Sequence, residues 1–243
     1  SGSGRRCTLP VRCGRQGEFH DVSFNLRKGE ILGVSGLVGA GRTELAKCIF
    51  GLTQKSQGHI RLYGKDYDAT SPAESIRRGM VYLPEERKQE GIFPLLSIAE
   101  NVALPNLDRF RGFLHMRFAE MQKEVQGYVE RLVIKIGNQK DRITSLSGGN
   151  QQKAIIARWL MKNSNILIMD EPTRGIDVNA KFEIQRELRR LTDKGLSIIF
   201  ISSEIEEVID VSDRIMVMHE GALKGIVNAG DASPERLLQL AMS

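Results

Sequence analysis

The sequence predicts an α/β domain built on a mostly parallel sheet, and three patterns support this. Continuous apolar runs at 166–169, 196–201 and 214–218 alternate with segments of helical spacing, as strands covered on both faces do. A glycine-rich stretch at 36–41 stands between an apolar run and a helical pattern. The apolar run that starts at residue 166 ends in two carboxylates, Asp170 and Glu171. Strand, glycine loop and helix in this order are typical of a phosphate site.

The composition is that of an ordinary globular domain. The 243 residues are 41% hydrophobic, which is enough to bury a substantial core. Lys and Arg number 35 against 30 Asp and Glu, and a formal charge of +5 without long blocks of one sign does not argue for nucleic acid. No apolar stretch approaches the ~20 residues of a membrane span. Three cysteines, Cys7, Cys13 and Cys48, form no CxxC pair, and this odd number favours a reducing, cytoplasmic compartment.

The amino-terminal region is expected to contribute little to the fold. Residues 1–6 carry no secretory signal and are interpreted as an expression scar or a cut linker, and residues 1–17 as a whole are assigned to a tag or linker. From residue 18 to 34, Val22, Phe24 and Leu26 alternate with polar residues, a turn follows, and an apolar run begins at 31. This pattern predicts a hairpin that leads into a buried strand. Further strands are expected at 60–63 and 80–83.

Helical patterns fill the middle of the chain. The spacing predicts a helix over 43–50 with Gly51 as its C-cap. Residues 97–136 indicate amphipathic helices without strands, so a helical insertion is expected at about 91–162 in a domain that spans 18–243. After Ser147, another helix places Ile155, Ile156, Trp159 and Leu160 on one apolar side.

A phosphate-binding loop is predicted at Gly36-Leu37-Val38-Gly39-Ala40-Gly41-Arg42-Thr43. It fits the P-loop spacing G-x-x-x-x-G-K-[ST] except that Arg42 replaces the lysine. Its glycines let backbone N–H groups approach phosphate oxygens, and the Thr43 hydroxyl could bind Mg²⁺. A guanidinium is wider than an ammonium and differently hydrated, so binding is expected to survive while catalysis suffers. By itself the loop could equally be a glycine-rich turn without a ligand.

The two carboxylates after residue 169 have distinct expected roles. A Mg²⁺-dependent NTPase needs one carboxylate close to the metal and one that orients the attacking water. Asp170 is therefore assigned to the metal and Glu171 to the water. Taken alone, a core strand followed by a polar turn would be the better explanation.

A third segment, Leu146-Ser147-Gly148-Gly149-Asn150-Gln151-Gln152-Lys153, opens a helix. Ser147 can cap this helix, and the two glycines let an anion approach its N-terminus closely. This segment resembles the signature of ABC-type ATPases, and the P-loop and the Asp-Glu pair accompany it in the family's order. We call residues 36–43 the P-loop and residues 146–153 the signature.

Residues 33–44, 146–153 and 170–178 resemble more narrowly the second ATPase half of tandem sugar-import ATPases of the ribose, galactose, xylose and autoinducer type. The resemblance implies an ABC ATPase fold, with a P-loop NTPase core, an antiparallel β subdomain and the helical insertion. It also implies ATP and Mg²⁺ as cofactors. In such proteins two similar halves share one chain, so this molecule resembles the carboxyl-terminal half alone.

The resemblance also implies a role for each matching residue. Nucleotide contacts fall on Gly36, Leu37, Val38, Gly39, Ala40, Gly41, Arg42, Thr43, Glu44, Glu85, Ser147, Gly148, Gly149, Gln151, Asp177 and Ser203. The metal contacts fall on Thr43, Asp170 and Glu85, and the catalytic residue is Glu171. Glu85 stands where the family usually has Gln, and Ser203 where it usually has a γ-phosphate-contacting His. The region around Cys13 lacks the expected adenine-stacking aromatic.

The P-loop side is thus degenerate while the signature is intact. The chain is therefore expected to complete the ATP site of a partner half better than it hydrolyses ATP at its own site.

The implied partners are the amino-terminal ATPase half of the same polypeptide, membrane-spanning permease subunits, and indirectly a periplasmic or extracellular sugar-binding protein. The resemblance also suggests that residues around 91–101 help form the surface where a membrane subunit docks, and a plain solvated face is the equal alternative. The expected location is the cytoplasmic face of the inner membrane. A non-hydrolysing regulatory half and a non-transport ABC protein acting on nucleic acid are the alternatives. The latter would predict cysteine clusters or basic linkers, so nucleic acid is not an expected partner.

No metal role is expected for His20, His59, His115 or His219, which lack paired ligand spacing.

Overall fold

The structure is a computed structural model that describes residues 7–15, 17–68, 70–112 and 116–242. The expected scar at 1–6 and His115 of the helical insertion lie outside these residues. The chain divides into two compact units, which are described separately below. Unit 1 holds the described residues of Ser1–Tyr82, Asn165–Pro172 and Leu188–Ser243, and unit 2 those of Leu83–Ser164 and Thr173–Glu187.

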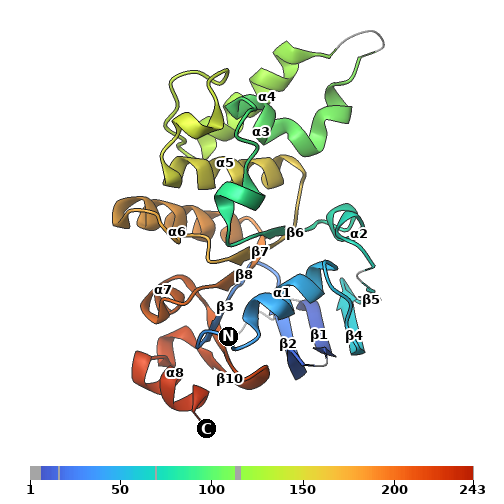
Figure 1. The fold of residues 1–243 in the computed structure, drawn as a ribbon, viewed down its shortest axis with the longest axis vertical. Helices are drawn as coiled ribbons and strands as arrows, with labels where there is room; N and C mark the ends of the chain where they lie inside the picture. Colours follow the sequence, from blue (N-terminus) through green and yellow to red (C-terminus); the bar gives the residue numbers. More distant parts are fainter. Residues whose placement is uncertain (1–6, 16, 69, 113–115, 243) are drawn as a thin grey trace. The chain divides into compact units, whose positions relative to one another are not determined.

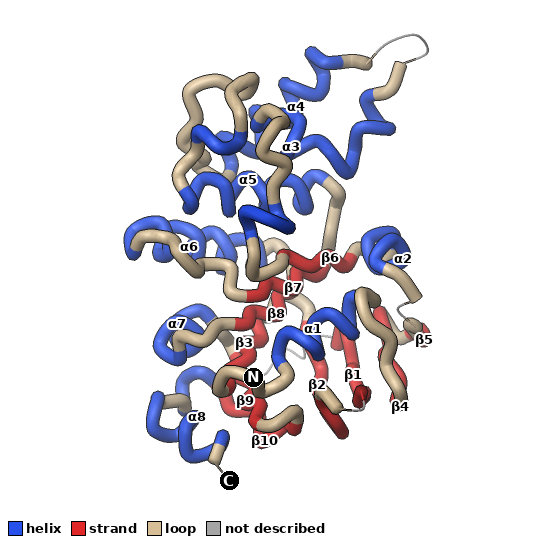
Figure 2. The backbone as a smooth tube through the Cα atoms, viewed as in Figure 1, coloured by secondary structure: helices blue, strands red, loops and turns tan. Residues whose placement is uncertain are grey.

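A ten-stranded sheet forms the centre of unit 1, in the strand order β5-β4-β1-β2-β10-β9-β3-β8-β7-β6 (Figures 1 and 2). The strands are β1 (Cys7–Arg15), β2 (Phe19–Arg27), β3 (Ile31–Gly36), β4 (Gln57–Leu62), β5 (Lys65–Asp66), β6 (Met80–Leu83), β7 (Ile166–Asp170), β8 (Ser197–Ile201), β9 (Arg214–His219) and β10 (Ala222–Asn228). β3 pairs in parallel with β8 and β9, and β7 with β8. The predicted parallel sheet is therefore confirmed. β1, β2, β4 and β5 form its antiparallel end.

The predicted hairpin over 18–34 is wrong. β2 pairs antiparallel with β1, whereas β3 lies between β8 and β9. The reason is burial, because β3 is buried along nearly its whole length and belongs in the centre of the sheet, while β2 alternates buried and exposed residues. The alternation identified a strand correctly, but it carried no information about the strand's partner.

The expected linker over 1–17 does not hold for residues 7–15. These residues form β1, which pairs with both β2 and β4. Val11 and Cys13 are buried in the core that this end of the sheet shares with the helix after the P-loop. With few apolar positions and a proline, the segment gives a weak strand signal.

Unit 1 also contains α1 (Arg42–Phe50), α2 (Pro72–Arg77), α7 (Ile205–Val211) and α8 (Pro234–Ala241), and α6 (Val178–Asp193) begins in unit 2 and ends in unit 1. The predicted helix after the P-loop is α1, and Gly51 caps its end in the left-handed conformation, at φ 83°. At the other end Gly41 is the N-cap and provides no side-chain cap. No helix in the described part of the chain is long and apolar enough to cross a bilayer.

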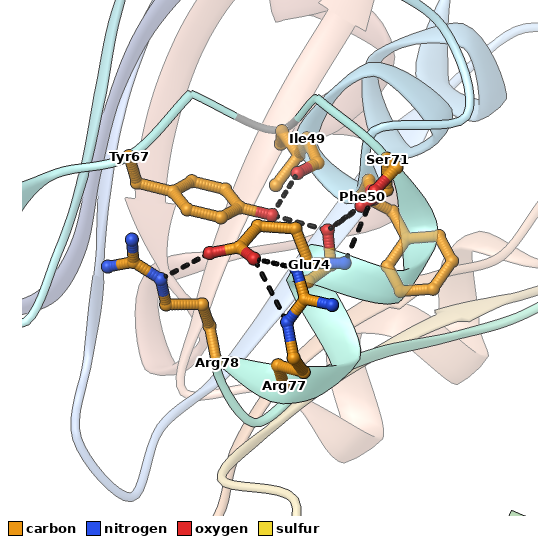
Figure 3. A network of polar contacts seen from close by, with 8 residues as sticks. Ile49, Phe50, Tyr67, Ser71, Glu74, Arg77 and Arg78 are labelled. Carbon is orange, nitrogen blue, oxygen red and sulfur yellow. Dashed lines mark hydrogen bonds and ion pairs between the residues drawn. The ribbon is translucent and has the colours of Figure 1, made fainter.

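A polar cluster holds the carboxyl end of α1 (Figure 3). The hydroxyl of Tyr67 donates to the Ile49 carbonyl at 3.3 Å and contacts the Ser75 hydroxyl at 2.5 Å. Ser75 donates to the Phe50 carbonyl at 2.5 Å. Glu74 of the short helix α2 forms ion pairs with Arg77 of the same helix and with its C-cap, Arg78. The last carbonyls of α1, which have no partner within the helix, are thereby satisfied.

The described residues of unit 2 form helices joined by loops and two isolated β-bridges. It contains α3 (Ile98–Ala103), a 3₁₀ segment (Leu104–Phe110), α4 (Phe118–Arg131) and α5 (Gly148–Met161), with a π-helical turn at Arg87–Gly91. Ser97 and Glu100 form a capping box at the start of α3. α5 is the helix that the signature opens, and Ser147 is its N-cap as predicted.

Candidate nucleotide site

The P-loop joins β3 to α1 in unit 1, and its glycines are required by its backbone. A Cβ on Gly36 would overlap the carbonyl oxygen of Met218. Gly39 and Gly41 have φ values of 80° and 85°, in the left-handed region that favours glycine. A Cβ on Gly41 would also lie 2.9 Å from the Glu18 carbonyl oxygen. The tip of the loop is open, because Val38 is 94% exposed. The loop thus presents backbone to a ligand.

Arg42, the substituted P-loop residue, points at the carboxyl ends of the parallel strands. Its Nη1 donates to the Ser202 carbonyl at 2.7 Å, and its Nη2 lies 3.8 Å from Oε1 of Glu171. The side chains of this ion pair are only 10% and 12% exposed. The guanidinium therefore contacts the residue predicted to orient the attacking water.

Glu171 follows β7 in a strained backbone conformation, with φ 46°. Its amide donates to the Ile201 carbonyl at 2.9 Å, and its Oε2 accepts the Ser203 hydroxyl at 3.2 Å. Burial raises the pKa of Glu171, and the Arg42 guanidinium and the Ser203 hydroxyl lower it. Raised basicity in a confined position suits a group that accepts a proton from water.

Asp170, the last residue of β7, is 1% exposed. The Tyr82 hydroxyl donates to its Oδ2 at 2.9 Å, while Oδ1 has no hydrogen-bond partner in the described part of the chain. Burial raises the pKa of Asp170, and the hydroxyls of Thr43 and Tyr82 lower it. A buried carboxylate oxygen without a partner, close to the Thr43 hydroxyl, is a donor set that fits Mg²⁺. Sequence reasoning missed Tyr82, whose partner lies 88 positions away.

A cavity of about 670 Å³ lies beside the P-loop, and Glu18 and Phe19, which line it, also lie against Gly41. Phe19 is only 1% exposed, so its ring offers no open face for stacking. Cys13 is buried with Cys48 as a free thiol and does not line the cavity. The remaining lining residues are Arg15, Gly17, His20, Ser56, Gln57 and Glu220. The sequence indicated that the region around Cys13 lacks an adenine-stacking aromatic, but it did not predict that these residues line a cavity.

In unit 2, the signature starts a closely packed helix. The Ser147 hydroxyl accepts the Asn150 amide at 3.5 Å. A Cβ on Gly149 would lie 2.6 Å from Cβ of Ala180, so α5 approaches the start of α6 closely. Lys153 is 3% exposed and forms an ion pair with Glu183 at 2.7 Å. Gly149 is thus required for packing, whereas Ser147 is exposed.

The other predicted site residues of unit 2 have partners of their own. Glu85 forms an ion pair with Arg174. Asp177 accepts the Ala180 amide at 3.0 Å and so caps α6. The Gln151 side chain donates to the Leu146 carbonyl at 3.0 Å. The predicted residues thus fall into two groups, each assembled within its own unit. Arg42, Thr43, Asp170, Glu171 and Ser203 belong to unit 1, and Glu85, Ser147, Gly148, Gly149, Gln151 and Asp177 to unit 2.

Arg158 of α5 holds the candidate docking segment at 91–101 through hydrogen bonds. This arginine is 5% exposed and donates to the Asn101 carbonyl at 2.6 Å, to Oδ1 of Asn101 at 3.0 Å and to the Gly91 carbonyl at 2.8 Å. Its guanidinium lies 5.4 Å from the ring centre of Phe93. Burial lowers the pKa of Arg158 to about 10. In the same segment, the apolar residues Phe93 and Leu95 are 45% and 78% exposed.

Comparisons with known proteins identify relatives over most of this chain. The family model described as ABC transporter matches residues 19–174. The chain is 46% identical over 222 residues to the xylose import ATP-binding protein XylG of Thermoanaerobacter pseudethanolicus, and 45% identical over 229 residues to the ribose import ATP-binding protein RbsA of Bacillus subtilis. These alignments cover 91% and 93% of this chain but 44% and 46% of the relatives, so the chain spans about half their length.

A solved structure gives the same fold. A nucleotide-free ATP-binding cassette from an ABC transporter superposes with a TM-score of 0.78 at 22% identity, covering 98% of this chain and 96% of the other. At that identity the likeness concerns the fold alone. The fold and the family match over residues 19–174 lead to one conclusion, that this chain belongs to the ABC transporter family.

Proposed function

We propose that this chain is an ATP-binding and ATP-hydrolysing domain that energises the import of a sugar or related small solute through a membrane transporter. The observation that carries the proposal is the cluster of Thr43, Asp170 and Glu171 behind a glycine-rich backbone loop. The names of the relatives, which are import ATP-binding proteins for xylose and ribose, support the class of solute.

In this proposal the nucleotide phosphates bind the P-loop residues Gly36 to Thr43 together with Glu44. Thr43 and Asp170 would hold Mg²⁺, which would neutralise phosphate charge. Glu171 orients the attacking water and accepts its proton. Ser203 positions Glu171 through the hydrogen bond at 3.2 Å.

Arg42 limits the chain's own site. Its contacts with Ser202 and Glu171 engage both the cation expected to hold phosphate and the carboxylate expected to hold water. Nucleotide binding must compete with these contacts, so hydrolysis at this site is slow. The same ion pair favours a second candidate, a regulatory half that binds ATP without hydrolysing it.

The signature has no such restriction, and we propose that it completes the ATP site of a second ATPase domain. Because the chain spans about half the length of its relatives, the proposed second domain is the amino-terminal half of the same polypeptide. The exposed apolar residues Phe93 and Leu95 fit docking of a permease subunit. A sugar-binding protein would act through that permease, and the domain would sit peripherally at the cytoplasmic face of the membrane.

The test compares Glu171→Gln with the matching change in the other ATPase domain of the complete transporter. ATPase rate and sugar uptake are measured at equal expression, with Arg131→Ala, an exposed charge on α4, as the control. A partial loss for Glu171→Gln and a near-complete loss for its counterpart are expected. No loss at all for Glu171→Gln would favour the regulatory half. Equal losses would contradict the proposed asymmetry, and uptake that needs neither domain would contradict the function.

A further inference from the structure

Arg87 lies against the start of the signature helix without an anionic partner. It begins the π-helical turn Arg87–Gly91, and the stem of its side chain passes over Gly91, where an added Cβ would lie 3.5 Å from its Cγ. Its guanidinium reaches Gly148, the first residue of α5, where an added Cβ would lie 2.9 Å from Nη2 and 3.6 Å from Cζ. Gly148 thus provides the space that the guanidinium of this arginine occupies.

This arrangement is electrostatically unfavourable within unit 2. The N-terminus of a 14-residue helix carries a partial positive charge, which repels a guanidinium. Nε of Arg87 is buried without a hydrogen-bond partner, and no ion pair of Arg87 occurs among the residues that the structure describes. Burial also lowers the pKa of Arg87. A cation here loses water and meets a like partial charge, and an anion would offset both costs.

The neighbouring carboxylate does not provide this compensation. Glu85, two residues before Arg87, forms its ion pair with Arg174 instead. Glu86 is exposed and forms no ion pair within the described part of unit 2. The free N–H groups of Arg87 and the backbone N–H groups that open α5 therefore lie together beside Gly148.

We propose that Arg87 binds the terminal phosphate of the nucleoside triphosphate that the signature engages on the second ATPase domain. This inference rests on the proposed role of the signature. A guanidinium fork matches the oxygens of a phosphate, and the helix N-terminus favours the same negative charge. Arg87 thus supplies in trans a cation for an ATP site whose P-loop belongs to the partner.

The experiment uses the complete transporter and the variants Arg87→Ala, Arg87→Met and Arg87→Lys. Methionine keeps the apolar stem without the charge, and lysine keeps the charge without the planar fork. Two readouts are taken, the equilibrium affinity for MgATP and the kcat/KM of ATP hydrolysis. Gly148→Asp tests the signature itself, and Arg131→Met is the matched control for loss of an exposed arginine.

We expect Arg87→Ala and Arg87→Met to lower kcat/KM by about tenfold to a hundredfold and to weaken MgATP binding, with Arg87→Lys in between. Arg131→Met should change neither value. If Gly148→Asp abolishes activity while Arg87→Met behaves like the wild type, the inference is wrong and the signature's role stands. If both leave activity intact, the signature's role fails and the inference with it. Should Arg87→Ala prevent folding, equal activities of the methionine and lysine variants would overturn the inference.

Discussion

Nη2 of Arg42 lies 3.8 Å from Oε1 of Glu171, and the two side chains are only 10% and 12% exposed. Arg42 is the first residue of α1, and Glu171 directly follows β7, 129 positions further along the chain. An ion pair at this depth is screened little by water. The charge state of Glu171 therefore depends on the residue that replaces the P-loop lysine.

Removing the Arg42 charge should move the titration of Glu171 to higher pH. Burial raises the pKa of Glu171, and the Arg42 guanidinium lowers it. Because Arg42→Ala removes this lowering contribution, the pKa of Glu171 should rise. Arg42→Lys retains a positive charge and should shift the titration less. The measurement is an NMR titration of the Glu171 carboxyl carbon in each variant. A titration that is identical in the alanine variant and the wild type would disprove the coupling.

Asp170→Asn should stabilise the domain at neutral pH by about 1 kcal/mol, because it removes a buried carboxylate whose charged form burial disfavours. The pKa of Asp170 is raised on folding, so the folded state binds its proton more tightly than the unfolded chain does. The resulting penalty is present above the folded pKa and disappears as the pH falls below the unfolded value. The gain from asparagine should therefore vanish in acid. Urea unfolding at several pH values measures it, and a gain that persists at low pH would point to another cause.

The two glycines of the signature should respond differently to alanine. A Cβ on Gly149 meets Ala180 at 2.6 Å in a packed contact, so Gly149→Ala should cost about 1–3 kcal/mol of unfolding free energy through overpacking. A Cβ on Gly148 meets the end of the Arg87 side chain, which can move, so Gly148→Ala should cost well under 1 kcal/mol. Chemical denaturation of the two variants compares them directly. Equal costs would mean that the Arg87 side chain is held as rigidly as Ala180 of α6.

Arg158→Met should loosen the segment at 91–101. The substitution leaves the carbonyls of Gly91 and Asn101 without their buried donor, a loss of about 3 kcal/mol. Hydrogen exchange of the Phe93 and Asn101 amides should accelerate more than a hundredfold, because each 1.4 kcal/mol corresponds to a factor of ten. Lys162→Met, which removes a half-buried cation that donates to the Pro105 carbonyl, is the control. Unchanged protection at both amides would show that Arg158 does not hold this segment.

The sequence was most informative where local pattern decides structure. The apolar runs of β7, β8 and β9, the left-handed cap at Gly51 and the Ser147 cap are all local signals, and the structure confirms each. Partners distant in the chain were not predictable. Nothing in the alternation of β2 indicates β1 rather than β3, and nothing near Asp170 indicates Tyr82. The contact of Arg42 with Ser202 likewise depends on two strand ends that only the sheet order brings together.

The polar cluster of Tyr67 and Ser75 also has a mechanical consequence. α1 is nine residues long, about 14 Å, and is clamped at its carboxyl end while its amino end has no side-chain cap. The amino end is held through a side chain instead, because Arg42 donates to the Ser202 carbonyl and pairs with Glu171. α1 is therefore a short strut anchored at both ends, by two hydroxyl groups at one end and by a guanidinium at the other. A ligand that displaced Arg42 from Ser202 and Glu171 would release one anchor and leave the other in place.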